Sequence, residues 1–547
     1  MLRTVASVLL VTWLRPLPGT AGETARWGGG ASPNSVTSAR DLPDKLEGAA
    51  PLWELKLGTH QYSIPTVDRG RIYLGINDAG VTREGYRPRG GGALLCVDLK
   101  TQNTVWELPI PRFMEGVKDP YHFDQWKCGV CSGPLVAGDR VFVVGNRGDV
   151  LCLDRGGQAD GNGGPFLDEL AYMGVAGSNA VLTATDGDIL WRFDLMKELG
   201  VLPHDTCAGT PLLADGLLYV GTGNGVDGRH RVCPRPDAPM LAVFDAQTGR
   251  LVAVDGEKTG RNMLHGSWTS PCLGEAGGKK VVFMAGGDGI LYAFAAPVPA
   301  SEGSAQILRK LWSEDCNPPH FRLKDGQPLA YSAWNHRTSD GPSEPVGTPV
   351  FDKGRVYVAV GQSPLHGLGK GCLTCFDAAT GAVVWRSEAL DRTLATVALR
   401  DGVIYLPDGA GTLHAFDAAT GATLWTHALE APVHYANARV ADGKVYVGTE
   451  RGDFWILKAG RERAVLSHTR LPSPPVTVAA ADGLLLIPMQ NRLSAYGRES
   501  KENLGVRNLD LGVECGTTRE NRASLVDNFS VLRSIAVGSK ADETEHD

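Results

Sequence analysis

A hairpin unit that recurs eight times along the 547 residues constrains the fold of this chain more than any other feature. Each copy places a glycine-containing turn of two residues between apolar strands, as in Asp442-Gly443-Lys444-Val445-Tyr446. Such turns are the strongest short-range signal of a β-hairpin. The other copies are Arg69–Tyr73, Gly138–Phe142, Asp215–Tyr219, Gly278–Phe283, Lys353–Tyr357, Asp401–Tyr405 and Asp482–Leu486. Because repeats of this kind assemble into one large body, we expect one domain rather than several.

A second signature, Asp-x-x-Thr-Gly followed four residues later by Trp, accompanies several copies. It is complete at Asp377–Trp385 and Asp417–Trp425, and Asn103 replaces the glycine before Trp106. Asp and Thr side chains can bond to the turn backbone, and Gly accepts a positive φ. In the copy at Asp245–Gly249 the tryptophan position is Ala253. We expect each tryptophan to lie on the outermost strand of its unit and to pack between neighbouring units.

The two ends of the repeat array are incomplete in complementary ways. The segment Leu52–Leu57 resembles an outermost strand that precedes the first complete unit, whereas the last unit, Pro475–Tyr496, lacks a tryptophan-bearing outermost strand. The last three spacings between units, 48, 41 and 40 residues, match four-stranded blades. We therefore predict an all-β fold: a single eight-bladed β-propeller of four-stranded antiparallel blades, closed by pairing the N-terminal strand with the last blade.

The segments outside the repeats set the remaining boundaries. Residues 1–21 have the pattern of a signal peptide, with Arg3, an apolar core from Thr4 to Leu14 and small residues after Pro18. We predict an N-terminal extension over 22–50, the propeller over 51–497, and a polar tail over 498–547 that is mostly disordered or forms a short helix. The apolar core is too short to span a bilayer as a helix. A periplasmic or secreted bacterial protein without a transmembrane segment is expected.

Composition limits the class of partner. The 61 acidic residues against 54 basic ones give a net charge of −7, and no basic run of nucleic-acid-binding type occurs. Eleven cysteines suit an exported chain, in which disulfides are permitted, and their odd number leaves at least one thiol free or bonded between chains. We expect a monomer that does not bind nucleic acid.

The Asp-x-x-Thr-Gly-x-x-x-Trp hairpins resemble the repeats of quinoprotein dehydrogenases and of the propeller lipoprotein of the outer-membrane Bam assembly machinery. Longer segments are similar to a group of exported bacterial PQQ-binding-like β-propeller repeat proteins. These segments are Ala159–Phe166, Trp191–Val201, Gly221–Asp227, His265–Pro271, Gly286–Gly289, Gly347–Val350 and Gly361–His366. The resemblance extends from about Trp27 to Tyr496 and implies the propeller fold. It does not imply that the quinone is bound, because the group is named for its repeats.

The resemblance also says what a quinoprotein dehydrogenase would need. Such an enzyme holds pyrroloquinoline quinone (PQQ) between a tryptophan and two adjacent, disulfide-linked cysteines, with a calcium ion and an aspartate base. This chain has no adjacent cysteines, and no motif assigns calcium ligands or a base. We therefore assign no catalytic residue, no metal ligand and no cofactor, and keep PQQ with calcium as the alternative.

Two Cys-x-x-Cys pairs occur, and neither is followed by the histidine of a c-type haem site. Cys128 and Cys131 lie in a loop and could close a small local disulfide. Cys372 and Cys375 lie on a predicted strand, where their side chains should point to opposite faces. The second pair is thus expected to be structural.

Polar and aromatic residues precede several predicted innermost strands, at the loops that converge on the axial funnel of a propeller. They are His60, Tyr62, Trp126, His204, Asp205, His265, Trp268, Arg392, His434 and Tyr435. The histidines could form a polar pocket or a metal site, although a histidine in a loop is usually solvated. We predict a non-catalytic scaffold that binds a protein, peptide or glycan through its inserted loops and this funnel. The alternative is a PQQ- and calcium-dependent oxidoreductase that acts on alcohols or sugars.

Overall fold

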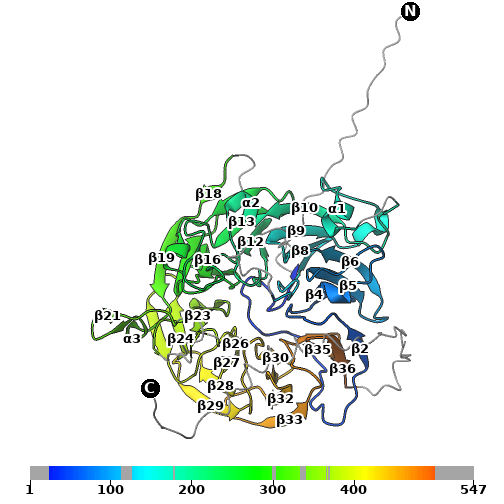
Figure 1. Ribbon diagram of the computed structural model, residues 1–547. Helices are drawn as coiled ribbons and strands as arrows, with labels where there is room; N and C mark the ends of the chain where they lie inside the picture. The colour runs from blue at the N-terminus through cyan, green and yellow to red at the C-terminus, as the bar shows by residue number, and fades with distance from the viewer. Residues whose placement is uncertain are drawn as a thin grey trace, which may run out of the picture. The chain divides into compact units, whose positions relative to one another are not determined.

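Eight antiparallel sheets form a closed β-propeller in the computed structural model, which describes residues 24–112, 126–175, 179–298, 303–332, 340–364, 366–367 and 370–498 (Figure 1). The sheets follow one another along the chain as blades 1 to 8. In blades 1 to 7 the strands run in sequence order from the axis outward, and in blade 8 the outermost strand comes from the N-terminal part of the chain. The predicted fold class is confirmed.

Blade 1 consists of β3 (Thr66–Asp68), β4 (Arg71–Asn77), β5 (Gly92–Asp98) and β6 (Thr104–Ile110). Blade 2 consists of β7 (Leu135–Ala137), β8 (Arg140–Val144), β9 (Asp149–Asp154) and β10 (Ile189–Asp194). Blade 3 consists of β11 (Leu212–Ala214), β12 (Leu217–Gly221), β13 (Leu241–Asp245) and β14 (Leu251–Val254). Blade 4 consists of β15 (Cys272–Ala276), β16 (Lys279–Ala285), β17 (Ile290–Ala295) and β19 (Lys310–Asp315). Short strands extend blades 2 and 3, because β1 (Thr24–Ala25) pairs with β7 and β18 (Gln306–Ile307) runs parallel to β14.

Blade 5 consists of β22 (Val350–Asp352), β23 (Arg355–Val360), β24 (Cys372–Asp377) and β25 (Val383–Ser387). Blade 6 consists of β26 (Ala398–Arg400), β27 (Val403–Pro407), β28 (Thr412–Asp417) and β29 (Thr423–Ala428). Blade 7 consists of β30 (Arg439–Ala441), β31 (Lys444–Gly448), β32 (Asp453–Lys458) and β33 (Val465–Arg470). Blade 8 consists of β34 (Ala479–Ala481), β35 (Leu484–Met489), β36 (Arg492–Tyr496) and β2 (Trp53–Lys56). The insertions carry the hairpin of β20 (Leu323–Lys324) and β21 (Gln327–Pro328), and the short helices α1 (Glu169–Met173), α2 (Leu195–Leu199) and α3 (Pro319–Arg322). Among the described residues, no helix has the length and apolar character needed to cross a membrane.

The Asp-Gly turns of the repeat form the tight hairpins between the first and second strands of the blades. Asp442 and Gly443 join β30 to β31 with φ values of +49° and +69°. A two-residue turn with positive φ at both positions matches the right-handed twist of the flanking strands. Aspartate and glycine recur at these turns because they tolerate the left-handed conformation best.

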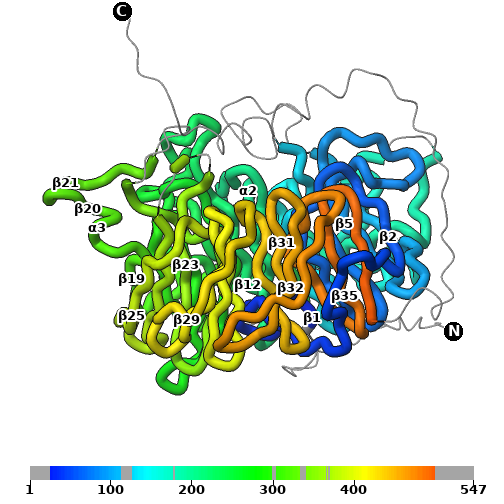
Figure 2. The backbone as a smooth tube through the Cα atoms, turned by 90° about the horizontal axis from the view of Figure 1, so that it is seen from below, coloured from blue at the N-terminus to red at the C-terminus, as the bar shows by residue number. Residues whose placement is uncertain are grey.

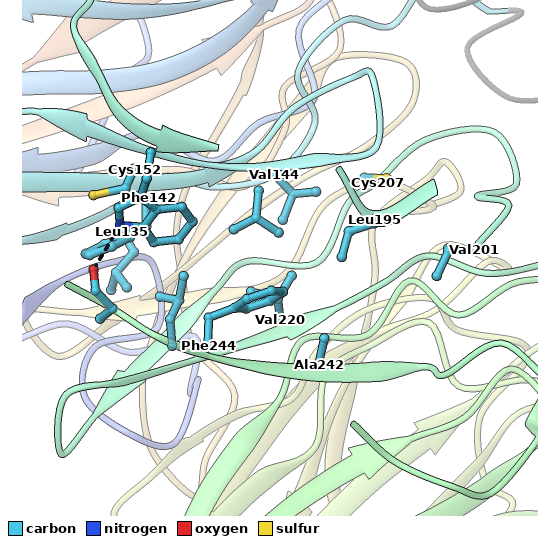
Figure 3. Packing of buried hydrophobic residues seen from close by; sticks show 14 of the residues in the cluster. Leu135, Phe142, Val144, Cys152, Leu195, Val201, Cys207, Val220, Ala242 and Phe244 are labelled. Carbon is cyan, nitrogen blue, oxygen red and sulfur yellow. Dashed lines mark hydrogen bonds between the residues drawn. The ribbon is translucent and has the colours of Figure 1, made fainter. Parts of the chain in front are cut away.

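The hydrophobic core is divided among the junctions between neighbouring blades. Figure 3 shows the cluster between blades 2 and 3, in which Phe142 of β8 lies near Phe244 of β13. Strand alternation supplies both faces of a blade. Cys372 joins the cluster between blades 4 and 5, whereas Cys375 on the same strand joins the cluster between blades 5 and 6. The prediction that these two cysteines point to opposite faces is confirmed.

Each signature tryptophan lies on an outermost strand and binds the next blade, as predicted. The indole N–H of Trp385 donates to the carbonyl oxygen of Ala418 at 3.2 Å. Equivalent bonds join Trp106 to Arg155, Trp191 to Ala246, Trp312 to Ala378 and Trp425 to Gly460. A Cβ atom at Gly421 would come within 2.4 Å of Cε3 of Trp385. The signature glycine is therefore required by the indole ring of the preceding blade as well as by its own φ of +74°. In blade 1 this position is occupied by Gln102, with a φ of +61°, so the assignment of Asn103 to it is wrong.

A chain of hydrogen bonds around the axis links the beginnings of the innermost strands. In most junctions a backbone N–H of one blade donates to a side-chain oxygen of the next. These bonds are Thr210 N to Ser270 Oγ, Ser270 N to Thr348 Oγ1, Thr348 N to Thr396 Oγ1, Thr396 N to Asn437 Oδ1 and Asn437 N to Thr477 Oγ1. Between blades 1, 2 and 3 the hydroxyls of Ser63 and Ser132 donate to the carbonyls of Ser132 and Gly209. We call this chain the axial hydrogen-bond ring.

The circle of eight blades is closed by the N-terminal strand β2, as the sequence predicts. Strand β2 pairs antiparallel with β36, with Trp53 opposite Ala495 and Lys56 opposite Arg492. Trp53, Leu52 and Leu57 belong to the hydrophobic cluster between blades 8 and 1. Segments from the two ends of the repeat array therefore share one sheet.

The segment between β1 and β2 crosses the centre of the ring on one face, and we call its residues 26–47 the strap (dark blue in Figures 1 and 2). Ser32 exchanges hydrogen bonds with the backbone of Phe351 on β22. Asn34 binds the backbone of Leu399 on β26 in the same two-bond manner. The strap also bonds with blades 3, 4 and 7 through Trp27, Ala31 and Thr37. It therefore ties together innermost strands from most of the ring.

One expectation about cysteine is wrong. Cys131 is a free thiol, so it forms no local disulfide with Cys128. The predicted signal peptide and the polar tail beyond Arg498 lie outside the described residues.

Deletion of Leu52–Leu57 should destabilise the propeller strongly. The deletion removes the ladder on β36 and three buried apolar side chains, which together are worth about 6 kcal/mol. We expect a much lower melting temperature and aggregation through the exposed edge, measured by differential scanning calorimetry and light scattering. Lys56→Ala on the same strand is the control and should change little, because its side chain is exposed; an unaltered melting profile after the deletion would contradict closure by β2.

Two glycine substitutions separate backbone strain from the indole contact. In Gly443→Ala the added Cβ atom has no other atom within 4 Å. The substitution destabilises the fold only because alanine must adopt a φ of +69°, which costs about 1–2 kcal/mol. Gly421→Ala adds the clash with Trp385, so we expect at least about 2 kcal/mol more destabilisation in chemical unfolding. Equal effects of the two substitutions would show that the indole of Trp385 does not hold its position.

Candidate functional site

Strand direction brings two kinds of loop to the same face of the propeller. The innermost strand and the second strand of a blade are antiparallel, so the start of the first lies beside the end of the second. His204 precedes β11 and His265 precedes β15, whereas His230 follows β12 and His366 follows β23. The four histidines therefore come from corresponding loops of blades 3, 4 and 5.

The rings of these residues meet in what we call the histidine cluster: His204, His230, His265 and His366. The Nε2 atom of His265 lies 3.1 Å from Nε2 of His204 and 3.1 Å from Nδ1 of His230. The same Nδ1 atom lies 2.9 Å from Nε2 of His366. His204, His265 and His366 are buried, and His230 is half-buried. Imidazole nitrogens from four loops thus face one another in a protected position.

The outward-facing nitrogens of the cluster fix how the rings are oriented. The Nδ1 atom of His204 lies 2.8 Å from the carbonyl oxygen of Val226, and Nδ1 of His366 lies 2.8 Å from that of Ser332. A carbonyl oxygen only accepts, so Nδ1 donates in both residues. The neutral ring then carries its lone pair on Nε2, which points into the cluster. Burial lowers the pKa of His366, which favours this neutral form.

A buried carboxyl group lies behind the third ring. Oε1 of Glu344 is 3.5 Å from Nδ1 of His265 and accepts a hydrogen bond of 2.8 Å from the hydroxyl of Tyr331. Burial raises the pKa of Glu344 to about 7. The ring of Trp268 packs edge-on against His265 at 4.8 Å, and its indole N–H donates to the carbonyl oxygen of His204. These contacts restrict the orientation of His265.

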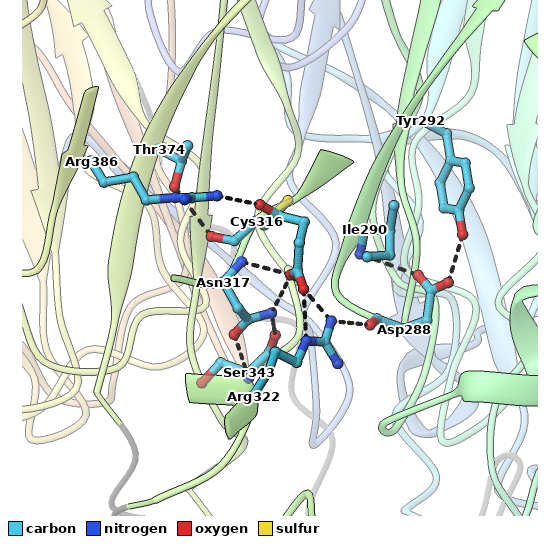
Figure 4. Close-up of polar contacts among 10 residues, drawn as sticks. Asp288, Ile290, Tyr292, Cys316, Asn317, Arg322, Ser343, Thr374 and Arg386 are labelled. Atoms are coloured by element: carbon cyan, nitrogen blue, oxygen red, sulfur yellow. Dashed lines mark hydrogen bonds and ion pairs between the residues drawn. The ribbon is translucent and has the colours of Figure 1, made fainter. Parts of the chain in front are cut away.

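A polar network holds the segment that carries Glu344 (Figure 4). Asn317 Nδ2 donates to the carbonyl oxygen of Ser343, and Ser343 N donates back to Asn317 Oδ1. Arg322 binds the carboxylate of Asp315 and the carbonyl oxygen of Asp288. The loop between β16 and β17 and the segment after β19 are thereby fixed against the insertion before β22. Glu344, adjacent to Ser343, is held next to His265 by this network.

Two residues beside the cluster have positive φ values that are uncommon for side chains with a Cβ atom. They are Asp205 at +57° and His230 at +54°. One carboxylate oxygen of Asp205 lies 3.6 Å from Nε2 of His204, and its side chain is 30% exposed. Such backbone conformations tend to occur where a side chain has to point in a particular direction. Asp205 brings negative charge to the accessible side of the cluster.

A second group of predicted residues lies across blades 1 and 7. The rings of Tyr62 and Tyr435 meet edge-on at 5.8 Å, and His60 and His434 flank them. Tyr435 is 54% exposed. Burial of the hydroxyl, followed by the charges of Glu450 and Asp205, raises the pKa of Tyr435. Asp205 therefore influences this tyrosine group as well as the histidine cluster.

The structure brings together most of the residues predicted for the funnel. His204, Asp205, His265 and Trp268 lie in or beside the histidine cluster, and His60, Tyr62, His434 and Tyr435 form the tyrosine group. Arg392 acts on the tyrosine group through its charge, which together with burial lowers the pKa of His434 to about 4. Trp126 is 41% exposed.

Sequence reasoning missed His230, His366, Tyr331 and Glu344. His230 and His366 lie between second and third strands, whereas only residues before innermost strands were considered. The antiparallel rule within a blade would have put both loops on the funnel face. Tyr331 and Glu344 lie in a long insertion that carried no recognisable motif.

The donor atoms of the funnel do not fit PQQ with calcium. Calcium prefers carboxylate and carbonyl oxygens, whereas imidazole nitrogen suits zinc, copper, nickel and iron. The described residues gather three histidine nitrogens, of His204, His230 and His265, within 4.8 Å of one another. The chain also has no adjacent cysteines to cover a quinone. No quinone step is therefore derived for this site.

Comparisons with known proteins agree with this architecture. The family model of the outer membrane protein assembly factor BamB matches residues 309–470. A quinone-dependent alcohol dehydrogenase, dehydrogenase subunit, from Komagataeibacter europaeus is 28% identical over 199 residues, which are 36% of this chain and 21% of the relative. Over part of its length the chain is therefore similar to PQQ-like repeat proteins. The match to this relative spans about a fifth of its length, so its activity does not transfer directly.

Solved structures with low sequence identity are also similar to this chain. A europium-containing methanol dehydrogenase superposes with a TM-score of 0.52 at 13% identity and covers 85% of this chain and 90% of its own. BamB from Moraxella catarrhalis gives a TM-score of 0.49 at 13% identity, with 82% and 97% covered. At such identities the likeness concerns the fold alone.

Proposed function

We propose that this chain is an exported binding propeller whose axial funnel takes a polyhydroxylated ligand, such as the end of a glycan. The observation that carries the proposal is Tyr435, an aromatic ring left 54% exposed where the innermost strands converge. Its edge-on contact with Tyr62 fixes the ring, so that its outer face can receive a ligand. An amphipathic ring of this kind offers apolar contact area and a polar hydroxyl at small entropic cost.

Charged groups around the tyrosine support a hydroxyl-bearing ligand. Asp205 and Glu450 both act on Tyr435, and burial raises the pKa of Glu450. Carboxyl groups at the rim of an aromatic platform can accept hydrogen bonds from sugar hydroxyls. A protein or peptide could also use the surrounding loops, but the exposed ring of Tyr435 with carboxyl groups beside it suits a hydroxyl-bearing ligand better. The cell envelope remains the expected location, and a monomer the expected state.

The quinoprotein alternative has one observation in its favour, the partial match to a quinone-dependent alcohol dehydrogenase subunit. Against it stand the imidazole donor set and the lack of adjacent cysteines. We therefore favour binding over quinone-dependent oxidation.

Tyr435→Ala tests the proposed platform. We expect the purified full chain to bind a neutral oligosaccharide on a glycan array, and the variant to bind at least tenfold more weakly, which corresponds to about 1.4 kcal/mol. Leu323→Ala on the β20–β21 hairpin is the matched control, since Leu323 is 49% exposed and lies in a separate two-stranded sheet. Affinity unaffected by Tyr435→Ala, or binding only of peptides and proteins, would refute the glycan assignment.

Titration with PQQ and calcium separates the two candidate functions. We expect no saturable absorbance change and no dye-linked oxidation of alcohols or sugars, because the chain has no adjacent cysteines to cover a quinone and the clustered donor atoms of the described funnel are imidazole nitrogens. Saturable one-to-one binding with quinone-dependent turnover would make the chain a quinoprotein and overturn the binding proposal.

A further inference from the structure

In one tautomer of His265, two inward-facing nitrogens of the histidine cluster both carry lone pairs and repel each other. Nε2 of His204 carries a lone pair, because its Nδ1 atom donates to Val226. If His265 directs Nδ1–H toward Glu344, 3.5 Å away, its Nε2 atom carries a lone pair as well. These two Nε2 atoms lie only 3.1 Å apart. Two lone pairs at this distance repel each other unless a cation lies between them.

The separations between the nitrogens fit ligands of a single metal ion. The three measured edges of the cluster are 3.1, 3.1 and 2.9 Å. With metal–nitrogen bonds of about 2.05 Å, two ligands lie about 2.9 Å apart at octahedral angles and about 3.35 Å apart at tetrahedral angles. These three separations therefore match those of neighbouring ligands on one ion, and the nitrogens of His204, His230 and His265 all lie within 4.8 Å of one another.

The surroundings of the rings match those of histidine ligands in metalloproteins. Metal-bound histidines usually donate their second N–H to a backbone carbonyl or a carboxylate, which fixes the ring and its tautomer. His204 and His366 donate to the carbonyl oxygens of Val226 and Ser332. His265 has the carboxyl group of Glu344 at the equivalent position. Two of the four rings thus have the second hydrogen bond that is typical of a ligand, and a third has a carboxyl group 3.5 Å from the corresponding nitrogen.

From this geometry we propose that the histidine cluster binds one first-row transition-metal ion, of the zinc and copper class, through His204 Nε2, His230 Nδ1 and His265 Nε2. His366 Nε2 is the fourth ligand. An all-imidazole donor set favours these ions over calcium or magnesium. The partly exposed Asp205 carboxylate, 3.6 Å from a ligand nitrogen, lies where it can hydrogen-bond to a water on the ion. The site goes beyond the proposed glycan binding and does not depend on it.

The competing explanation is a metal-free cluster in which the rings share protons. A proton on Nε2 of His265 could satisfy His204, and one on Nδ1 of His230 could satisfy His366. Such a network needs no ion and predicts no stoichiometric metal binding. Metal content therefore distinguishes the two explanations directly.

The test uses the full chain, purified without a histidine tag, stripped with EDTA and dialysed against Zn²⁺ or Cu²⁺. We expect about one ion per chain by inductively coupled plasma mass spectrometry, together with nitrogen splittings in the electron paramagnetic resonance spectrum of the copper form. His230→Ala should abolish stoichiometric binding, and it alters a half-buried loop residue rather than the core. Glu344→Gln should weaken affinity by about 10- to 100-fold, because it removes the carboxylate behind His265 and keeps a side-chain oxygen that can accept from Tyr331.

His320→Ala is the matched control. His320 is exposed and pairs with Glu388 on the rim, so its loss should leave metal binding unchanged. Circular dichroism and the melting temperature of the stripped proteins report whether each variant is folded. Three results would overturn the proposal: less than stoichiometric binding by the native chain, retained binding in a folded His230→Ala, or equal loss in His320→Ala. Should His230→Ala fail to fold, the copper spectrum of the native chain still decides, since it must contain imidazole nitrogen.

Discussion

The axial hydrogen-bond ring is the interaction on which the rest of the molecule depends. It binds the start of one innermost strand to the next through hydroxyl or amide side chains such as Ser270, Thr348 and Asn437. At the crowded axis, backbone groups of short strands would otherwise be buried without partners, which is costly. The bonds set the angle between blades, and this angle determines where the loops of the funnel face come to lie. The positions of the histidine cluster and of the tyrosine group therefore depend on the angle between the blades.

Two further layers reinforce this arrangement at increasing distance from the axis. Hydrophobic clusters fill the wedge between blades, and tryptophans such as Trp385 clamp the outer strands to the next blade. Each layer uses a different chemistry: polar side chains where space is smallest, aliphatic ones in the middle, and large aromatic rings where the blades diverge. The taper of the propeller is thus matched by the size of the residues, as is typical of closed β-architectures.

The fold was largely predictable from the sequence because its signals are local and repeated. A turn such as Asp442-Gly443 determines its own hairpin, and the complementary ends at Trp53 and Tyr496 indicate closure without further information. The site was predictable only in part. His204 and His265 follow the repeat, whereas Glu344 reaches His265 through an insertion whose path depends on Asn317, Arg322 and Asp315. Such a path has no periodicity, so only three-dimensional packing reveals it. His230 and His366 could have been found by applying strand direction to a second set of loops.

The pairing of β2 with β36 has a consequence for how the chain is made. Glu54 and Ser494, which are hydrogen-bonded across this pair, are separated by 440 residues. At ribosomal rates of about 5–20 residues per second, the early strand waits about 20–90 s before its partner has been synthesised. Throughout that interval the apolar face of Trp53 lacks its native cover, and the strap lacks the later blades that it joins. The part of the propeller that is translated first is consequently among the last to form its native contacts. The nascent chain is therefore more vulnerable to misassembly than the closed propeller.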